Sequence, residues 1–140
     1  MIYEFCAENV TLLEKAMQAG ARRIELCDNL AVGGTTPSYG VTKAAVELAA
    51  NYDTTIMTMI RPRGGDFVYT DLEIAIMLED IRLTTQAGSQ GVVFGALTAD
   101  KKLDKPNLEK LIAASKGMEI VFHMAFDLSL IHISKPTRPY

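Results

Sequence analysis

Short apolar segments recur along this chain, and each is followed by a segment whose apolar residues have helical spacing. The strand-like segments begin near residues 2, 22, 54, 91 and 118. Strands that alternate with helices pair in parallel, because each helix crosses over the sheet before the next strand begins. The segments at 54–60 and 91–95 are apolar throughout, as strands covered on both faces are. We therefore expect an α/β fold with a parallel sheet.

Two closures of a parallel sheet are compatible with this alternation, an open doubly wound sheet and a (β/α)8 barrel. No Gly-x-Gly-x-x-Gly turn follows the first strand, which argues against a dinucleotide-binding sheet. Polar residues follow several of the strands, and the sites of (β/α)8 barrels lie at the carboxyl ends of their strands. We predict a (β/α)8 fold of the TIM-barrel type, of which this chain holds about five βα units.

The beginnings of two helices carry candidate capping residues. Asn9 or Thr11 precedes the first helical pattern, and Thr70 or Asp71 precedes the long apolar pattern that ends at Gly88. Oxygen-bearing side chains at these positions accept hydrogen bonds from the first free backbone N–H groups of a helix.

Alternation of side chains along the strands predicts which residues face the inside of the barrel. In the first two strands the apolar pairs belong under the helices, which leaves a repeated Glu-x-Cys pattern for the inner face. The same alternation puts Met57 and Met59 on one face of the third strand, and it turns His123 inward at the end of the fifth strand. The predicted inner set is Glu4, Cys6, Glu25, Cys27, Met59, Arg61 and His123, with Arg63 and Asp66 on the rim.

The two arginines that follow the third strand are candidates for anion binding. Arg61 and Arg63, with Asp66 beside them, carry planar guanidinium groups that suit a carboxylate or a phosphate. The alternative is a structural network in which the arginines neutralise Glu4, Glu25 or Asp66, since buried charges need partners.

Three further residues are candidates for proton transfer. His123 could act as a general acid or base, and Glu4 or Glu25 could serve with it or in its place. The alternative is that His123 is a structural residue. The loop at 33–36 (GGTT) could add backbone and hydroxyl donors for an anion, or form only a turn.

Composition and charge exclude some partners. With 14 basic and 17 acidic residues and a net charge of −3, the chain lacks the positive field that nucleic-acid or anionic-membrane binding needs. No apolar segment approaches the roughly 20 residues that span a bilayer. The first residues do not have the pattern of a signal peptide, so we expect a cytosolic protein whose two cysteines are thiols, metal ligands or core residues.

Six segments in this order give the chain a resemblance to a known family. They are EFC at 4–6, RIELC at 23–27, GGTTPSYG at 33–40, MIRPRGGDF at 59–67, GVVFG at 91–95 and FHMAFD at 122–127. Over residues 1 to about 127 the chain resembles the copper homeostasis protein family CutC.

The resemblance implies a cytosolic (β/α)8 barrel linked to copper handling, with chains that associate into homo-oligomers. It also implies a Cu(I) site at Cys6 and Cys27, whose thiolates are soft ligands that suit Cu(I). Thioethers of Met57 and Met59 could add ligands, although they are also ordinary core residues, and the cysteines could be small buried residues as well. This function would not require catalysis. The alternatives are a barrel enzyme acting on a small anionic metabolite, or a truncated fragment without function.

The chain departs from the family pattern in two places. Met124 replaces an arginine, and the familiar sequence stops at Asp127, about three βα units before the family does. We expect one domain at 1–127 and an unrelated tail at 128–140. Five strands cannot close a barrel, so we expect the isolated chain to be marginally stable or to depend on association.

Overall fold

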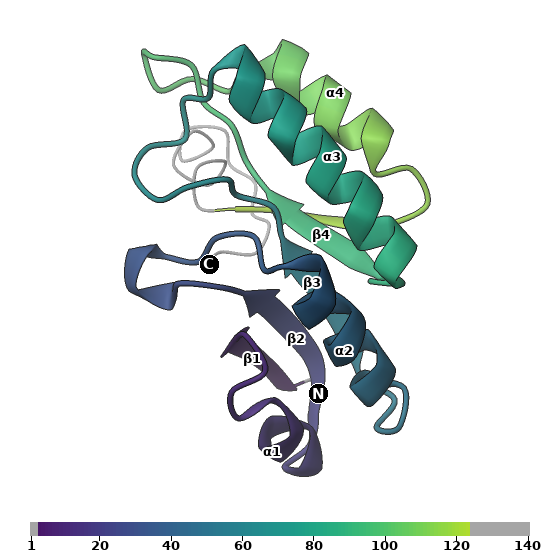
Figure 1. Cartoon of the computed structure of the whole chain (residues 1–140). Helices are drawn as coiled ribbons and strands as arrows, with labels where there is room; N and C mark the ends of the chain where they lie inside the picture. The colour runs from purple at the N-terminus through teal and green to yellow at the C-terminus, as the bar shows by residue number, and fades with distance from the viewer. Residues whose placement is uncertain (1–2, 124–140) are drawn as a thin grey trace.

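The computed structural model describes residues 3–123. Strands and helices alternate along this part of the chain (Figure 1). The elements are β1 (Tyr3–Glu8), α1 (Leu13–Gln18), β2 (Ala21–Cys27), a 3-10 turn (Leu30–Val32), α2 (Tyr39–Ala49), β3 (Thr55–Met59), α3 (Asp71–Ala87), β4 (Gly91–Phe94), α4 (Lys105–Ala114) and β5 (Glu119–Phe122).

All five strands belong to one sheet, in which each strand pairs in parallel with the next along the chain. The order is β1-β2-β3-β4-β5. Figure 1 shows a strongly curved sheet with α2, α3 and α4 packed on the same side of it. The predicted α/β fold with parallel strands is therefore confirmed, and the strand order is that of consecutive units of a (β/α) barrel.

Two apolar clusters join the helices to the outer face of the sheet. Ile74, Met77 and Ile81 follow the spacing of one helical face, and they pack with Val92 and Phe94 of β4. A second cluster lies beneath α1 and α2 and includes Leu13, Met17, Ile24, Leu26, Ala45 and Ile56. Burying one such side chain stabilises a fold by about 1.5–3 kcal/mol, so these clusters supply most of the driving force.

The helix beginnings match the capping predictions in one case and not in the other. Thr70 caps α3, and its hydroxyl accepts from the N–H of Glu73 while the Glu73 carboxylate accepts from the N–H of Thr70. The prediction for α1 is wrong. Leu12 precedes that helix with φ 60°, and no side chain makes a cap hydrogen bond there. Because α1 has only six residues, packing of Leu13 and Met17 holds it in place.

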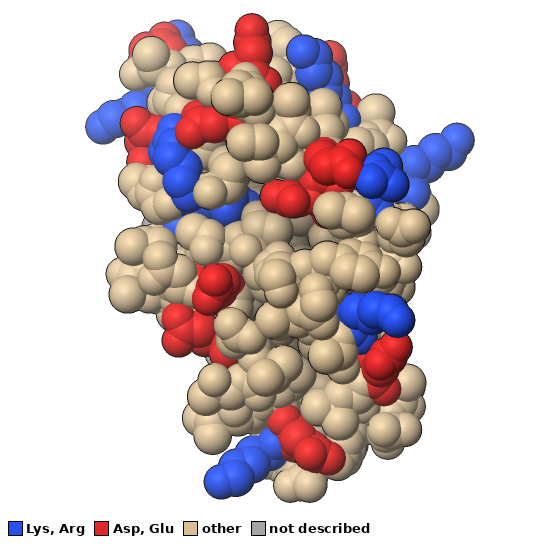
Figure 2. All heavy atoms as spheres, in the orientation of Figure 1, with Lys and Arg blue, Asp and Glu red and all other residues tan. Residues whose placement is uncertain are grey.

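None of the helices in the described residues is long and apolar enough to cross a bilayer. On the helical face in Figure 2, acidic and basic side chains are interspersed with uncharged ones. This face therefore lacks the one-signed field of a nucleic-acid-binding surface. Met124 and the predicted tail at 128–140 lie outside the described residues.

Candidate functional site

The pairing register brings most of the predicted inner set onto one face of the sheet. Cys6 is the partner of Glu25, and Glu25 is in turn the partner of Met57. Cys27 pairs with Glu8, two residues further along β1 than Cys6, so the two cysteines are diagonal neighbours on adjacent strands. The prediction from strand alternation is confirmed in this respect.

Sulfur atoms gather at this face. Cys27 is buried in one cluster with Met57, Met59 and Val93. A Cβ built on Gly34 would lie 3.2 Å from Cys27 Sγ and 3.5 Å from Met59 Cε, so the loop that follows β2 presses on both residues. Cys6 is exposed, and Cys27 is 1% exposed.

Both thiols lie in surroundings that oppose their ionisation. Cys6 Sγ donates a long hydrogen bond of 3.6 Å to Glu25 Oε1, and Cys27 Sγ donates one of 3.5 Å to the carbonyl oxygen of Ala7. Burial, followed by the negative charge of Glu25, raises the pKa of Cys6 to about 11 and the pKa of Cys27 to about 12. Both cysteines are therefore protonated at neutral pH, and a metal ion must displace their protons to bind.

Arg61 lies at the end of β3 and is 5% exposed. Its NH1 donates to the carbonyl oxygens of Val32 at 2.6 Å and Gly34 at 3.0 Å, and its NH2 donates to that of Gly65 at 2.9 Å. The guanidinium carbon lies 4.9 Å from the ring centroid of Phe67. Arg61 thus holds the loop after β2 against the loop after β3.

The loop at 33–36 uses its backbone donors internally. The N–H groups of Gly33, Gly34, Thr35 and Thr36 donate to the carbonyls of Leu30, Asn29, Asp28 and Arg61. The suggestion that these amides serve an anion is therefore wrong, because the loop turns carbonyl oxygens towards Arg61. Gly33 and Gly34, with φ of 95° and 96°, allow this turn.

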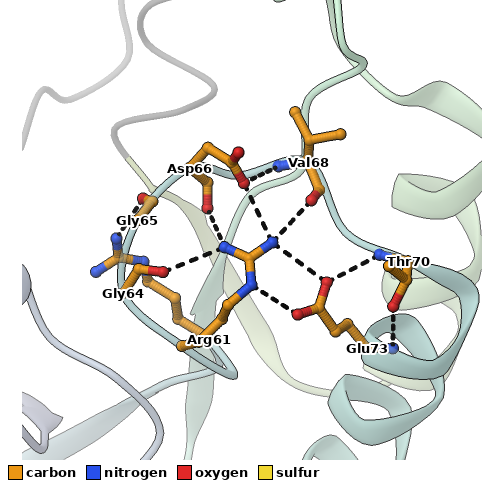
Figure 3. Close-up of polar contacts among 8 residues, drawn as sticks. Arg61, Gly64, Gly65, Asp66, Val68, Thr70 and Glu73 are labelled. Carbon is orange, nitrogen blue, oxygen red and sulfur yellow. Dashed lines mark hydrogen bonds and ion pairs between the residues drawn. The ribbon is translucent and has the colours of Figure 1, made fainter.

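Arg63, the second predicted anion-binding arginine, is a structural residue in this geometry. It donates to Glu73 through Nε at 2.6 Å and through NH2, and it pairs with Asp66 at 3.1 Å. NH1 of Arg63 also donates to the carbonyl oxygens of Gly64 and Asp66, and NH2 donates to that of Val68. Figure 3 shows these residues together with Glu73. With Nε, NH1 and NH2 so engaged, Arg63 fastens the loop to the beginning of α3. The predicted alternative of a pair with Asp66 is confirmed.

His123 closes the inner face at the end of β5. Its ring centroid lies 5.0 Å from that of Phe67, and it hydrogen-bonds the backbone of Gly33. Burial, followed by the positive charge of Arg61, lowers the pKa of His123 to about 4. The imidazole is therefore neutral at pH 7 and could accept a proton only weakly.

The two glutamates proposed for proton transfer are in different places. Glu25 lies at the candidate site beside Cys6. Glu4 lies at the amino-terminal end of the face, where its carboxylate is 3.8 Å from Arg23 Nε. Arg23 also reaches across β3 and β4 to Glu119 at 2.6 Å. The alternative partners predicted for Glu4 are Arg61 and Arg63, with Arg23 assigned to neither face, whereas the ion pair of Glu4 in the structure is with Arg23.

A cavity of about 320 Å³ opens where these side chains meet, and its walls include Cys6, Glu25, Gly33, Arg61, Phe67 and His123. Leu30 and Val32 complete it from the loop after β2. Sequence reasoning missed Phe67, although its place in the MIRPRGGDF segment was a signal. A larger cavity of about 540 Å³ lies between α3 and α4. We do not assign the site there, because Arg82, the one charged residue lining it, is paired with Glu79.

Fold and site together define an α/β protein of the (β/α) barrel class, with thiols, a carboxylate, an arginine and a histidine at one end of its parallel strands. The family model described as "CutC family" matches residues 1–134. The chain belongs to the CutC family.

Known relatives agree with this assignment. A CutC family protein of Streptococcus pyogenes serotype M6 is 56% identical over 127 residues, which cover 91% of this chain and 61% of the relative. The CutC family protein of Enterococcus faecalis is 53% identical, and the match covers 91% of this chain and 61% of that relative. The CutC family protein of Bacteroides thetaiotaomicron is 44% identical, and the match covers 90% of this chain and 50% of that relative.

A solved structure has the same fold. The crystal structure of CutC from Streptococcus agalactiae, described as a candidate copper homeostasis protein, matches with a TM-score of 0.87 and 50% identity. The match covers 91% of this chain and 61% of that one. The chain thus spans between half and about three fifths of the length of these relatives.

Proposed function

We propose that this protein serves copper homeostasis by holding Cu(I) through the thiolates of Cys6 and Cys27. The observation that carries the proposal is the placement of both thiols on one inner face, on adjacent strands, with Met59 beside the buried one. The S. agalactiae relative, described as a candidate copper homeostasis protein, is in agreement.

The chemistry of the donor set suits this ion. Thiolates and thioethers are soft ligands, and Cu(I) is a soft cation that tolerates two ligands. Within the described residues no group of three or more histidine, cysteine, aspartate or glutamate side chains has metal-binding geometry, which disfavours ions that need several hard ligands.

Glu25 has two opposing effects in this proposal. Its charge raises the pKa of both thiols, which makes their deprotonation costly, and the same charge attracts a cation that replaces the protons. Cu(I) affinity should therefore rise with pH up to the thiol pKa values, by as much as about a hundredfold per pH unit if two protons leave. Free thiols and Cu(I) both persist in a reducing compartment, so we place the protein in the cytosol.

The proposal is tested by titrating the chain with Cu(I) against a chromogenic chelator under anaerobic, reducing conditions. We expect about one Cu(I) per chain, with binding lost in the double variant Cys6→Ser/Cys27→Ser. The control is Met118→Leu, which removes a sulfur far from the site and should leave binding unchanged. Copper binding that survives in the double variant would disprove the proposal.

A further inference from the structure

Arg61 is a buried cation that forms no ion pair with a carboxylate within residues 3–123. Within residues 3–123 the ion pairs of the other inner and rim arginines are with Glu4, Glu119, Asp66 and Glu73, and none involves Arg61. It donates to three neutral carbonyls and lies against the face of the Phe67 ring and beside the hydroxyl of Tyr69, which is also neutral because burial raises the pKa of Tyr69 to about 12. Burying a charge is costly unless an opposite charge accompanies it.

The same guanidinium also has an unused donor. Within the described residues, Arg61 Nε is a buried nitrogen atom without a hydrogen-bond partner. Leaving such a donor unsatisfied costs about 1–3 kcal/mol, and more when the group is charged. Arg61 lines the cavity of about 320 Å³, so this unused donor belongs to a residue of the cavity wall.

The contrast with Arg63 shows that this state is specific to Arg61. Arg63 lies two residues away, yet its Nε, NH1 and NH2 are all engaged, and it is paired with two carboxylates. An anion at Arg61 could accept a hydrogen bond from an unused donor of a cation that has no ion pair. An anion at Arg63 would find every guanidinium nitrogen engaged and the charge already paired.

We propose that the cavity binds a small organic molecule whose single anionic group, a carboxylate or a phosphate, accepts a hydrogen bond from Arg61 Nε. Glu25 lines the same cavity, so a ligand that also carries an ammonium or hydroxyl group is favoured over one that is otherwise apolar. The volume is at the lower end of the range for small-molecule sites, which limits the ligand to a small metabolite. This inference does not depend on copper binding.

His123 is compatible with this ligand. Its lowered pKa keeps the ring neutral at pH 7, so His123 adds no second positive charge and can serve as a hydrogen-bonding wall. The positive charge of Arg61 that contributes to this lowering is the same charge that would attract the anion.

The test is nitrogen-15 NMR of the arginine Nε–H groups of the whole chain during titration with inorganic phosphate. We expect one Nε–H resonance, which disappears in Arg61→Lys, to shift in a saturable way. In the same titration, phosphoethanolamine should bind more tightly than ethyl phosphate, and Glu25→Gln should abolish that difference without abolishing phosphate binding.

Controls separate this site from general charge effects. Arg82→Gln removes an exposed cation on α3 and should leave the phosphate affinity unchanged, whereas Arg61→Gln should weaken it by at least about tenfold. If Arg61→Gln fails to fold, Arg61→Lys still assigns the Nε–H resonance of Arg61, and its response to phosphate in the unmodified chain tests the proposal. A wild-type Arg61 resonance that does not respond to phosphate would overturn the proposal, and so would equal affinity in the Arg61 and Arg82 variants.

Discussion

At the scale of single residues, Glu25 controls the chemistry of the inner face. It accepts the hydrogen bond of Cys6, and it contributes after burial to the raised pKa of both cysteines. The result is a pair of thiols that resist oxidation and alkylation, because the thiolate is the reactive form.

Replacing Glu25 should make Cys6 more reactive. In Glu25→Gln the pKa of Cys6 should fall from about 11 towards the ordinary 9.0, so alkylation by iodoacetamide at a fixed mildly alkaline pH should become faster. Each pKa unit is worth up to about tenfold in rate. The control is Glu8→Gln, whose charge acts on Cys27. Equal Cys6 rates in the two variants would show that Glu25 has no special role.

Gly91 is a second residue whose identity is dictated by its neighbours. A Cβ there would clash with the side chain of Met57 and would lie 2.6 Å from the carbonyl oxygen of Glu119. The methionine can move, but the carbonyl belongs to the paired strand β5 and cannot.

Gly91→Ala should therefore lower the free energy of unfolding by about 1–3 kcal/mol, as overpacking does. Gly40→Ala is the matched control, since its Cβ would meet only Ser38 Oγ at 3.9 Å in α2. That change should be neutral or stabilise by up to about 1 kcal/mol. Urea unfolding of the two variants measures the difference, and equal loss in both would refute the packing argument.

At the scale of elements, the beginning of α3 joins helix capping to loop anchoring. Glu73 accepts from the N–H of Thr70 and from Arg63, which in turn holds the carbonyls of the loop after β3. The hydrogen bond from Arg63, followed by those from Thr70, lowers the pKa of Glu73 below the ordinary 4.5.

This lowered pKa predicts a dependence of stability on pH. The contribution of ionised Glu73 is fully present above pH 4.5 and is lost as the pH falls through its lower folded-state pKa. The melting temperature of the wild type should therefore fall more steeply below pH 4.5 than that of Glu73→Gln. Glu109→Gln, an exposed change on α4, controls for the loss of one charge. Parallel acid curves for wild type and Glu73→Gln would contradict this role.

Local signals in the sequence predicted elements better than they predicted side-chain partners. The sequence offered Thr70 or Asp71 as the residue that caps the long helix, and Thr70 caps α3 in the structure. Strand alternation placed Cys6, Glu25 and Met59 on one face, because the period of a strand is fixed by covalent geometry. By contrast, two arginines of the same segment, Arg61 and Arg63, have opposite surroundings, which depend on how two loops fold back rather than on any local pattern.

At the scale of the whole molecule, the order of the parallel strands brings distant segments to one rim. Cys6, Arg61 and His123 come from β1 and from the ends of β3 and β5, and they line one cavity. The alternation of strands and helices made this convergence predictable. The ion pair between Arg23 of β2 and Glu119 of β5 was not predictable, because it joins strands that are not neighbours in the sheet.

Ligation of Cu(I) by two thiolates of one inner face determines which atoms surround the bound ion. X-ray absorption spectroscopy at the copper edge, on the Cu(I)-loaded chain under anaerobic conditions, tests it most directly. We predict that only sulfur atoms coordinate the copper, and that this signal is lost in Cys6→Ser/Cys27→Ser and kept in Met118→Leu. A first shell of nitrogen or oxygen, as Glu25 or His123 would give, would contradict it.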